Sequence, residues 1–258
     1  MVAAVVTILG FVGIVVQLGL QKKKDRIELI LKLSADFFNN SKFMAVFKIL
    51  DSDSLSECNN SIRKIIEGGE IKSVDGKPIE GVEEIDLNSY MNFFNSLAIL
   101  VEDKIVSQSD VMKLFRYQLE KTFTSVEMIR YMEDYGFDRI KLLLPNSFFF
   151  YATLATKNDR ELLNEVKPIS EFLGDGRKIK LHNYKIEVVG ANAEYKGLVK
   201  SKDRKIKPFE GSEVHISDDA DWTKLFDTLD NYEEVDVLYT RSIIQVNKKQ
   251  FLWVYLKK

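Results

Sequence analysis

The chain has 258 residues, of which 45% are hydrophobic and 29% charged, a composition typical of a folded protein that excludes wholesale disorder. Its 37 basic and 39 acidic residues give a formal net charge of −2, so it lacks the overall basic field of a nucleic-acid-binding protein. The single cysteine, Cys58, excludes an intramolecular disulfide and a thiolate metal cluster, and two histidines, His182 and His215, argue against a multi-histidine metal site.

The first residues predict a membrane anchor. Val2–Leu20 contains no charged residue, and at 1.5 Å per residue it would cover close to the ~30 Å hydrocarbon core of a bilayer. Lys22, Lys23 and Lys24 follow at once, which reverses the charge order of a secretory signal peptide. By the positive-inside rule, the rest of the chain would lie in the cytoplasm. We therefore expect a single-pass transmembrane anchor at residues 1–21, in preference to a buried or an interfacial helix.

The next segment, residues 22–143, is predicted to be a helical region, because apolar residues recur in it at three- and four-residue steps. Ser107 and Asp110 resemble a capping box before one helix, and another helix should end at Gly136. We assign no chemistry to this region, since aromatic stripes of this spacing usually pack in a core. A homo-oligomer could form through it.

Together with its anchor, the helical region loosely resembles an uncharacterised prokaryotic family of membrane-anchored helical proteins. The resemblance rests on the anchor, the basic residues after it and the segment from Asn88 to Phe115. It implies no activity.

The pattern changes after Pro145, where short strands alternate with short helices without a regular β-α-β repeat. We therefore expect residues 144–258 to form an α+β domain that folds alone. The predicted helices are 158–166 and 219–229, a turn is predicted at Asp175-Gly176, and the predicted strands are 147–151, two within 179–189, 213–216, 240–246 and 251–256.

Two features of this C-terminal part could carry chemistry. Tyr151-Ala152-Thr153-Leu154 lies where a strand runs into a helix, and backbone N–H groups exposed there suit an anionic group such as a carboxylate. An ordinary strand exit is the alternative. The second feature is an acidic stretch from Glu213 to Asp236, which holds nine carboxylates and one basic residue. Such a run is usually a solvated face, but a carboxylate beside aromatics and like charges can serve as a general acid or base.

These features resemble the gamma-glutamylcyclotransferase superfamily, including its gamma-glutamylamine cyclotransferase branch. The likeness covers about Ser147 to Leu256. The family's Tyr-Gly-Ser/Thr-Leu motif is matched by residues 151–154, its Gly-Glu-Val/Leu-Tyr strand by 211–216 with one insertion, its Leu-Asp-x-x-Glu-Gly by 229–234 and its Tyr-x-Arg by 239–241.

The resemblance implies a small mixed β-barrel with flanking helices and an intramolecular reaction. The α-amine of a γ-glutamyl substrate attacks its own side-chain carbonyl, which yields 5-oxoproline and releases an amine. Glu233 matches the glutamate proposed as the general acid and base, and neither a cofactor nor a metal is implied. The residues that would bind the substrate are Tyr151, Ala152, Thr153, Leu154, Tyr239 and Arg241.

The leading hypothesis is therefore a membrane-anchored cyclotransferase-like enzyme with a small γ-glutamyl-type substrate and no nucleic-acid partner. Ala152 and Glu234 stand where the family has glycine, which removes backbone freedom and could alter the site. Two alternatives stay open: a non-catalytic module that binds a γ-glutamyl or amino-acid-like ligand, and a structural protein whose helical region binds partners.

Overall fold

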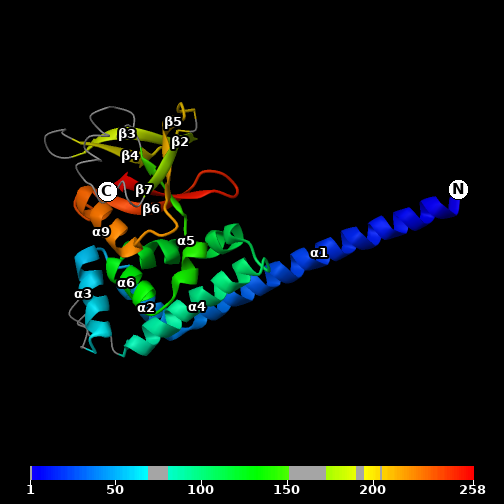
Figure 1. Ribbon diagram of the computed structural model, residues 1–258, viewed down its shortest axis with the longest axis horizontal. Helices are drawn as coiled ribbons and strands as arrows, with labels where there is room; N and C mark the ends of the chain where they lie inside the picture. The colour runs from blue at the N-terminus through cyan, green and yellow to red at the C-terminus, as the bar shows by residue number, and fades with distance from the viewer. Residues whose placement is uncertain (1, 69–80, 151–172, 190–194, 204) are drawn as a thin grey trace.

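The computed structural model describes residues 2–68, 81–150, 173–189, 195–203 and 205–258. A layer of helices lies on one side of a sheet formed by the C-terminal part of the chain (Figure 1). The helices are α1 (Val2–Asn39), α2 (Ser41–Leu50), α3 (Leu55–Ile66), α4 (Glu84–Glu102), α5 (Gln108–Thr124), α6 (Val126–Asp134), the 3-10 helix η1 (Asp138–Leu143) and α9 (Trp222–Tyr232).

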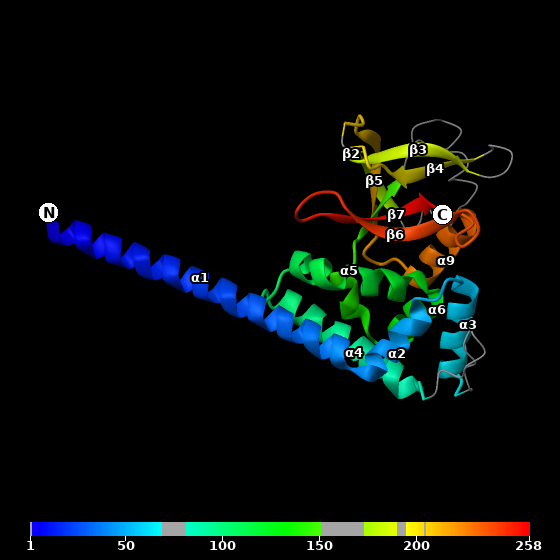
Figure 2. The ribbon, with the colours of Figure 1, turned by 180° about the vertical axis from the view of Figure 1, so that it is seen from behind.

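The predicted membrane anchor is wrong. Val2–Leu20 is not an element of its own, because α1 continues from it without a break through charged residues such as Lys24 and Glu28 to Asn39. Figure 2 shows the N-terminal half of this helix extending away from the rest of the molecule. Among the residues that the structure describes, no helix is long and apolar enough to cross a membrane. The predicted single-pass membrane topology, with most of the chain in the cytoplasm, depended on this anchor and is therefore also wrong.

Local capping signals determine where several helices begin and end. At the start of α5, the Ser107 hydroxyl accepts a hydrogen bond from the backbone N–H of Asp110 at 3.2 Å, and the Asp110 carboxylate binds back to Ser107. After α6, Gly136 has a φ of 75°, a left-handed conformation that ends the helix. Both boundaries are confirmed as predicted.

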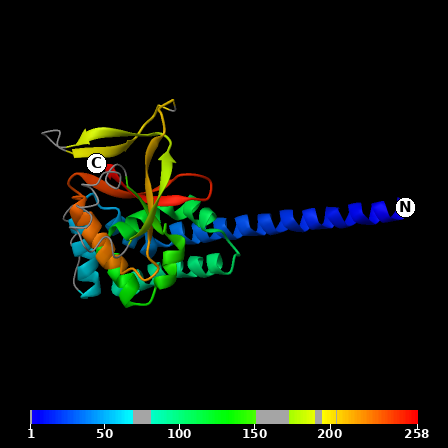
Figure 3. The same cartoon turned by 45° about the horizontal axis from the view of Figure 1, so that its top comes forward.

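The seven strands in the described part of the chain form a curled half-barrel, whereas the family resemblance implied a small mixed β-barrel (Figure 3). The strand order is β2-β5-β1-β7-β4-β3, and β6 pairs with β7 on the side. Strand β7 runs parallel to β1 and β4 and antiparallel to β6. The strands are β1 (Ser147–Phe150), β2 (Leu173–Leu181), β3 (Tyr184–Val189), β4 (Tyr195–Lys200), β5 (Phe209–Ile216), β6 (Tyr239–Gln245) and β7 (Phe251–Lys257).

In the C-terminal part, one predicted turn is wrong and one predicted helix falls outside the residues that the structure describes. The turn predicted at Asp175-Gly176 is wrong, because both residues lie inside β2, where the pairing with β5 shifts register between Leu173 and Gly176. An irregularity within a paired strand thus accounts for the Asp-Gly pair. The helix predicted for residues 158–166 lies outside the described residues.

One large hydrophobic core extends from the helical region into the C-terminal part. Successive side chains of a strand point to opposite faces, and β1 shows this directly. Phe148 and Phe150 join the large core with residues of the helices, whereas Phe149 joins a smaller cluster on the other face of the sheet. Helix α9 packs against α6, and β6 packs against α5. The division near residue 144 stays a prediction, and the core is continuous across it.

Candidate active site

The candidate acid/base residue, Glu233, is the C-cap of α9. The helix ends in a Schellman motif, in which the N–H of Val235 donates to the carbonyl oxygen of Asp230 at 2.9 Å and the N–H of Glu234 donates to that of Asn231 at 3.3 Å. Glu234 adopts the left-handed conformation that this motif requires, with a φ of 47°. The family's glycine at this position is the residue that adopts such a φ without strain.

Glu233 is half-buried, and burial raises the pKa of its carboxyl from 4.5 to about 7. The nearby charge of Asp230 raises this pKa further in the same direction. A carboxyl that titrates near neutral pH can both accept and donate a proton under physiological conditions. This property is the one that a general acid/base needs.

Asp230, one turn before Glu233, is buried and sits in a polar cluster. Its Oδ1 accepts a hydrogen bond from the hydroxyl of Tyr255 on β7 at 3.0 Å, and its Oδ2 lies 3.3 Å from Nη2 of Arg241 on β6. Burial raises the pKa of Asp230 to about 6, although the positive charge of Arg241 and the Tyr255 hydrogen bond act to lower it. Two neighbouring carboxyls with raised pKa values therefore lie at the end of α9.

Arg241 is fully buried, and its guanidinium is held by main-chain and aromatic groups. Its Nη2 donates to the carbonyl oxygen of Phe123 at 2.5 Å and to that of Thr124 at 3.0 Å. The guanidinium carbon lies 3.8 Å from the ring centroid of Phe226 and 5.3 Å from that of Trp253, within the range of a cation–π interaction. The ion pair with Asp230 thus connects Arg241 to the C-terminal end of α9.

The structure locates the remaining predicted residues only in part. Tyr239 is buried at the start of β6. Tyr151, Ala152, Thr153 and Leu154 lie outside the described residues, directly after β1. Their assignment as substrate-binding residues stays a prediction.

Sequence reasoning gave no role to two members of this cluster, Asp230 and Tyr255. Asp230 belongs to the Leu-Asp-x-x-Glu motif, and that signal could have pointed to it. Tyr255 offered no comparable signal, because only the pairing of β6 with β7 places Arg241 opposite Tyr255.

Glu213 on β5, another buried carboxylate, behaves differently from Asp230. Burial alone would raise its pKa, but hydrogen bonds from Arg177 at 2.5 Å and from Gln250 at 2.7 Å outweigh it, and the pKa of Glu213 lies below its ordinary value. The Ser147 hydroxyl also donates to it. Glu213 therefore stays charged near neutral pH and is a structural carboxylate instead of a proton carrier.

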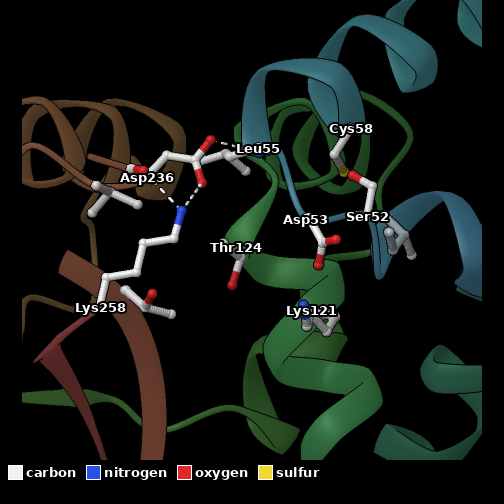
Figure 4. A pocket seen from close by; sticks show the side chains of 11 residues that line it. Ser52, Asp53, Leu55, Cys58, Lys121, Thr124, Asp236 and Lys258 are labelled. Carbon is white, nitrogen blue, oxygen red and sulfur yellow. Dashed lines mark hydrogen bonds and ion pairs between the residues drawn. The ribbon is translucent and has the colours of Figure 1, made fainter. Parts of the chain in front are cut away.

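A cavity of about 200 Å³ lies behind the turn that follows Glu233, between that turn, α3 and α5 (Figure 4). On one side of it, the Asp236 carboxylate accepts hydrogen bonds from the N–H of Leu55 at 2.8 Å and from Lys258 at 2.9 Å. The Cys58 thiol also lines the cavity, but burial raises its pKa to about 12, so it stays protonated and is a poor nucleophile. Within the described residues, no group of three or more His, Cys, Asp and Glu side chains could hold a metal ion.

The C-terminal part thus combines a half-barrel sheet with a helix end at which the carboxyl of Glu233 has a raised pKa. A family model described as gamma-glutamyl cyclotransferase, AIG2-like, matches residues 148–258, which confirms the predicted resemblance of this part of the chain to that family. The match supports a gamma-glutamyl cyclotransferase type of domain. It does not extend to the helical region, and the other predicted family resemblance is unsupported. Comparison with curated proteins and with solved structures gave no match.

Proposed function

We propose that the protein cyclises a γ-glutamyl amide or amine to 5-oxoproline and releases the amine, with Glu233 as the general acid and base. The observation that carries this proposal is the half-buried carboxyl of Glu233, whose pKa of about 7 suits proton transfer in both directions. Glu233 lies within the residues that the family model matches, and in the sequence it stands at the glutamate of the family's Leu-Asp-x-x-Glu motif.

The reaction needs one new bond, one broken bond and the movement of two protons. The α-nitrogen of the substrate forms a bond to its own γ-carbonyl carbon, and the bond from that carbon to the leaving nitrogen breaks. The attacking ammonium group loses two protons as it becomes the lactam N–H: Glu233 accepts one and delivers it to the leaving nitrogen, and the second passes through solvent to the released amine, which departs as an ammonium ion. Because both reacting groups belong to one molecule, the protein mainly holds the folded conformer and moves the proton.

The substrate would be oriented by the residues that follow β1 in the sequence. In this proposal, backbone N–H groups of Tyr151–Leu154 bind its α-carboxylate, and Tyr239 lies beside it. A small ligand fits the matched family, and no cofactor takes part in the proposed steps.

The test is 5-oxoproline formation from a panel of γ-glutamyl dipeptides, including γ-glutamylalanine and ε-(γ-glutamyl)lysine. Glu233→Gln keeps size and polarity but cannot carry the proton, so turnover should fall by about 10²–10⁴-fold. Glu234→Gln is the matched control, because Glu234 is the neighbouring carboxylate and is exposed; its turnover should stay near the wild-type value. Wild-type turnover by Glu233→Gln would exclude this mechanism. Binding of the dipeptides without turnover would favour the non-catalytic binding module.

A further inference from the structure

The helix that carries Glu233 is held at its start by the helical region. Glu133, on α6, accepts hydrogen bonds from the backbone N–H of Trp222 at 3.0 Å and from that of Thr223 at 3.3 Å. It also accepts one from the Thr223 hydroxyl at 2.7 Å. A carboxylate at this end is favourable because the first N–H groups of a helix have no partner within it. Glu133, distant in sequence, thus adds to the N-cap that Asp221 forms on α9 through the N–H of Lys224.

The other end of α9 is tied to the helical region through Arg241. The Phe123 and Thr124 carbonyls that bind its guanidinium belong to the last turn of α5, where a positive charge is favourable. The same Nη2 atom faces the carboxylate of Asp230, whose main-chain carbonyl closes the Glu233 turn. One buried side chain therefore connects α5 with this turn.

A third connection lies just beyond the turn. The Asp236 carboxylate accepts the N–H of Leu55, the first residue of α3. Asp236 itself has a φ of 77°, so the backbone on this side of Glu233 is also in an uncommon conformation that its surroundings must maintain.

We propose that the helical region is the frame that positions Glu233, and that Arg241 is a positioning residue acting through Asp230. The proposal rests on the proposed role of Glu233. It assigns a role to a region that the matched family model does not include. It also gives Arg241 a task different from substrate binding, because the guanidinium is buried and its Nη2 atom is bonded to two main-chain carbonyls of α5, although Nε and Nη1 have no hydrogen-bond partner in the described part of the chain.

Steady-state kinetics on the γ-glutamyl dipeptide panel separate the two roles of Arg241. Arg241→Lys keeps the positive charge but removes the Nη2 atom, which contacts two carbonyls and a carboxylate at once. We expect kcat to fall about tenfold while KM changes less than about twofold. Arg177→Lys is the control, since Arg177 also pairs with a buried carboxylate, and its kcat should not change. A raised KM with unchanged kcat for Arg241→Lys would show substrate binding and overturn the proposal.

Glu133→Gln tests whether the helical region positions Glu233, at a residue outside the buried cluster of Asp230, Arg241 and Tyr255. It weakens the cap on α9, and kcat should fall severalfold at constant KM. Asn40→Ala, which removes the N-cap of α2, costs a similar ~1 kcal/mol of stability and does not touch α9. Its kcat should match the wild type. Equal effects of these two variants on kcat would mean that only general stability is involved, and would overturn the proposal.

A measurement without substrate keeps this inference separable from the proposed reaction. The melting temperature of Glu233→Gln minus that of its parent, followed against pH, reports the titration of Glu233 in the folded chain. The titratable groups that act on Glu233 among the described residues are Asp230 on α9 and Tyr255 on β7, and Arg241 and Asp227 act on Asp230.

We expect the midpoint of this titration to move down by roughly half a pH unit or more when the parent carries Asp230→Asn or Arg241→Lys. Asp230→Asn removes a like charge near Glu233. Arg241→Lys loosens the turn and lets water reach the Glu233 carboxyl. Unchanged midpoints in both parents would overturn the positioning role even if the wild type is active. Absence of turnover with shifted midpoints would instead exclude the proposed reaction and leave the positioning intact.

Discussion

Gly211, on β5, lies directly against Phe149 and Phe150 of the neighbouring strand β1. A Cβ atom at Gly211 would come within 2.7 Å of the Phe150 carbonyl oxygen and even closer to the Phe149 ring. Since main-chain atoms cannot move aside as a flexible side chain can, this contact requires glycine at the position. The glycine of the family's Gly-Glu-Val/Leu-Tyr strand thus has a packing reason in this chain.

Gly211→Ala should therefore destabilise the protein by about 2–3 kcal/mol, the usual cost of forcing extra atoms into a packed site. At about 2–4 °C per kcal/mol, the melting temperature should fall by roughly 5–10 °C. Gly176→Ala is the control on the adjacent strand β2, where a Cβ would make only ordinary contacts at 3.5 Å or more. Equal melting temperatures for the two variants would contradict the packing argument.

Glu234→Gly should stabilise the chain, because Glu234 holds a φ of 47° that glycine adopts freely. The left-handed conformation costs a non-glycine residue about 1 kcal/mol, so a rise of roughly 2–4 °C in melting temperature is expected. Lys104→Gly provides the control: Lys104 has a φ of 58° in a similar Schellman motif after α4. Both changes should stabilise, and only Glu234→Gly should alter turnover. A lower melting temperature for Glu234→Gly would show that its side chain makes a net stabilising contact.

The features that could be predicted from the sequence are those specified by neighbouring residues. The capping box of Ser107 and Asp110, the helix end at Gly136 and the hairpin of β6 and β7 depend on contacts within a few positions. Local patterns gave wrong predictions where the structure of a segment depends on the residues around it. The apolar segment at the N-terminus is part of a longer helix with charged residues, and the Asp175-Gly176 pair lies in a paired strand.

The sequence motif indicated Glu233 as the candidate residue, an assignment that stays a prediction, but it did not indicate the buried residues that hold the end of α9. Arg241 lies 118 positions from Phe123, and no spacing rule indicates that its guanidinium would bind the end of α5. In the sequence, an arginine beside a predicted catalytic motif suggests a ligand for an anionic substrate. Its complete burial depends on the packing of β6 between α5 and α9, which is a tertiary property.

The raised pKa of Glu233 predicts how stability depends on pH. Below about pH 4.5 the carboxyl is protonated in both the folded and the unfolded chain. Between 4.5 and about 7 the folded chain keeps a proton that the unfolded chain releases, so stability falls as the pH rises through this window. The loss would approach roughly 3 kcal/mol at 1.36 kcal/mol per pKa unit.

Glu233→Gln does not titrate, so its melting temperature should rise relative to the wild type between pH 5 and pH 8. The expected gain is roughly 6–12 °C, measured by differential scanning calorimetry at both pH values. Glu210→Gln is the control, because ion pairing with Lys180 lowers the pKa of the exposed Glu210. A constant difference between Glu233→Gln and wild type across this range would mean that Glu233 is solvated in the folded chain.

The contacts across residue 144 predict that residues 144–258 do not fold cooperatively alone, contrary to the expectation from length. A fragment that starts at Leu144 would leave the buried guanidinium of Arg241 without the Phe123 and Thr124 carbonyls. It would also expose the face of the sheet where Phe148 and Trp253 join the core of the helical region. Each large apolar side chain left exposed forfeits about 1.5–3 kcal/mol of burial, a large part of the stability of a domain of this size. We expect a broad, non-cooperative melt by circular dichroism, whereas a single sharp transition near that of the full chain would show that residues 144–258 are an independent domain.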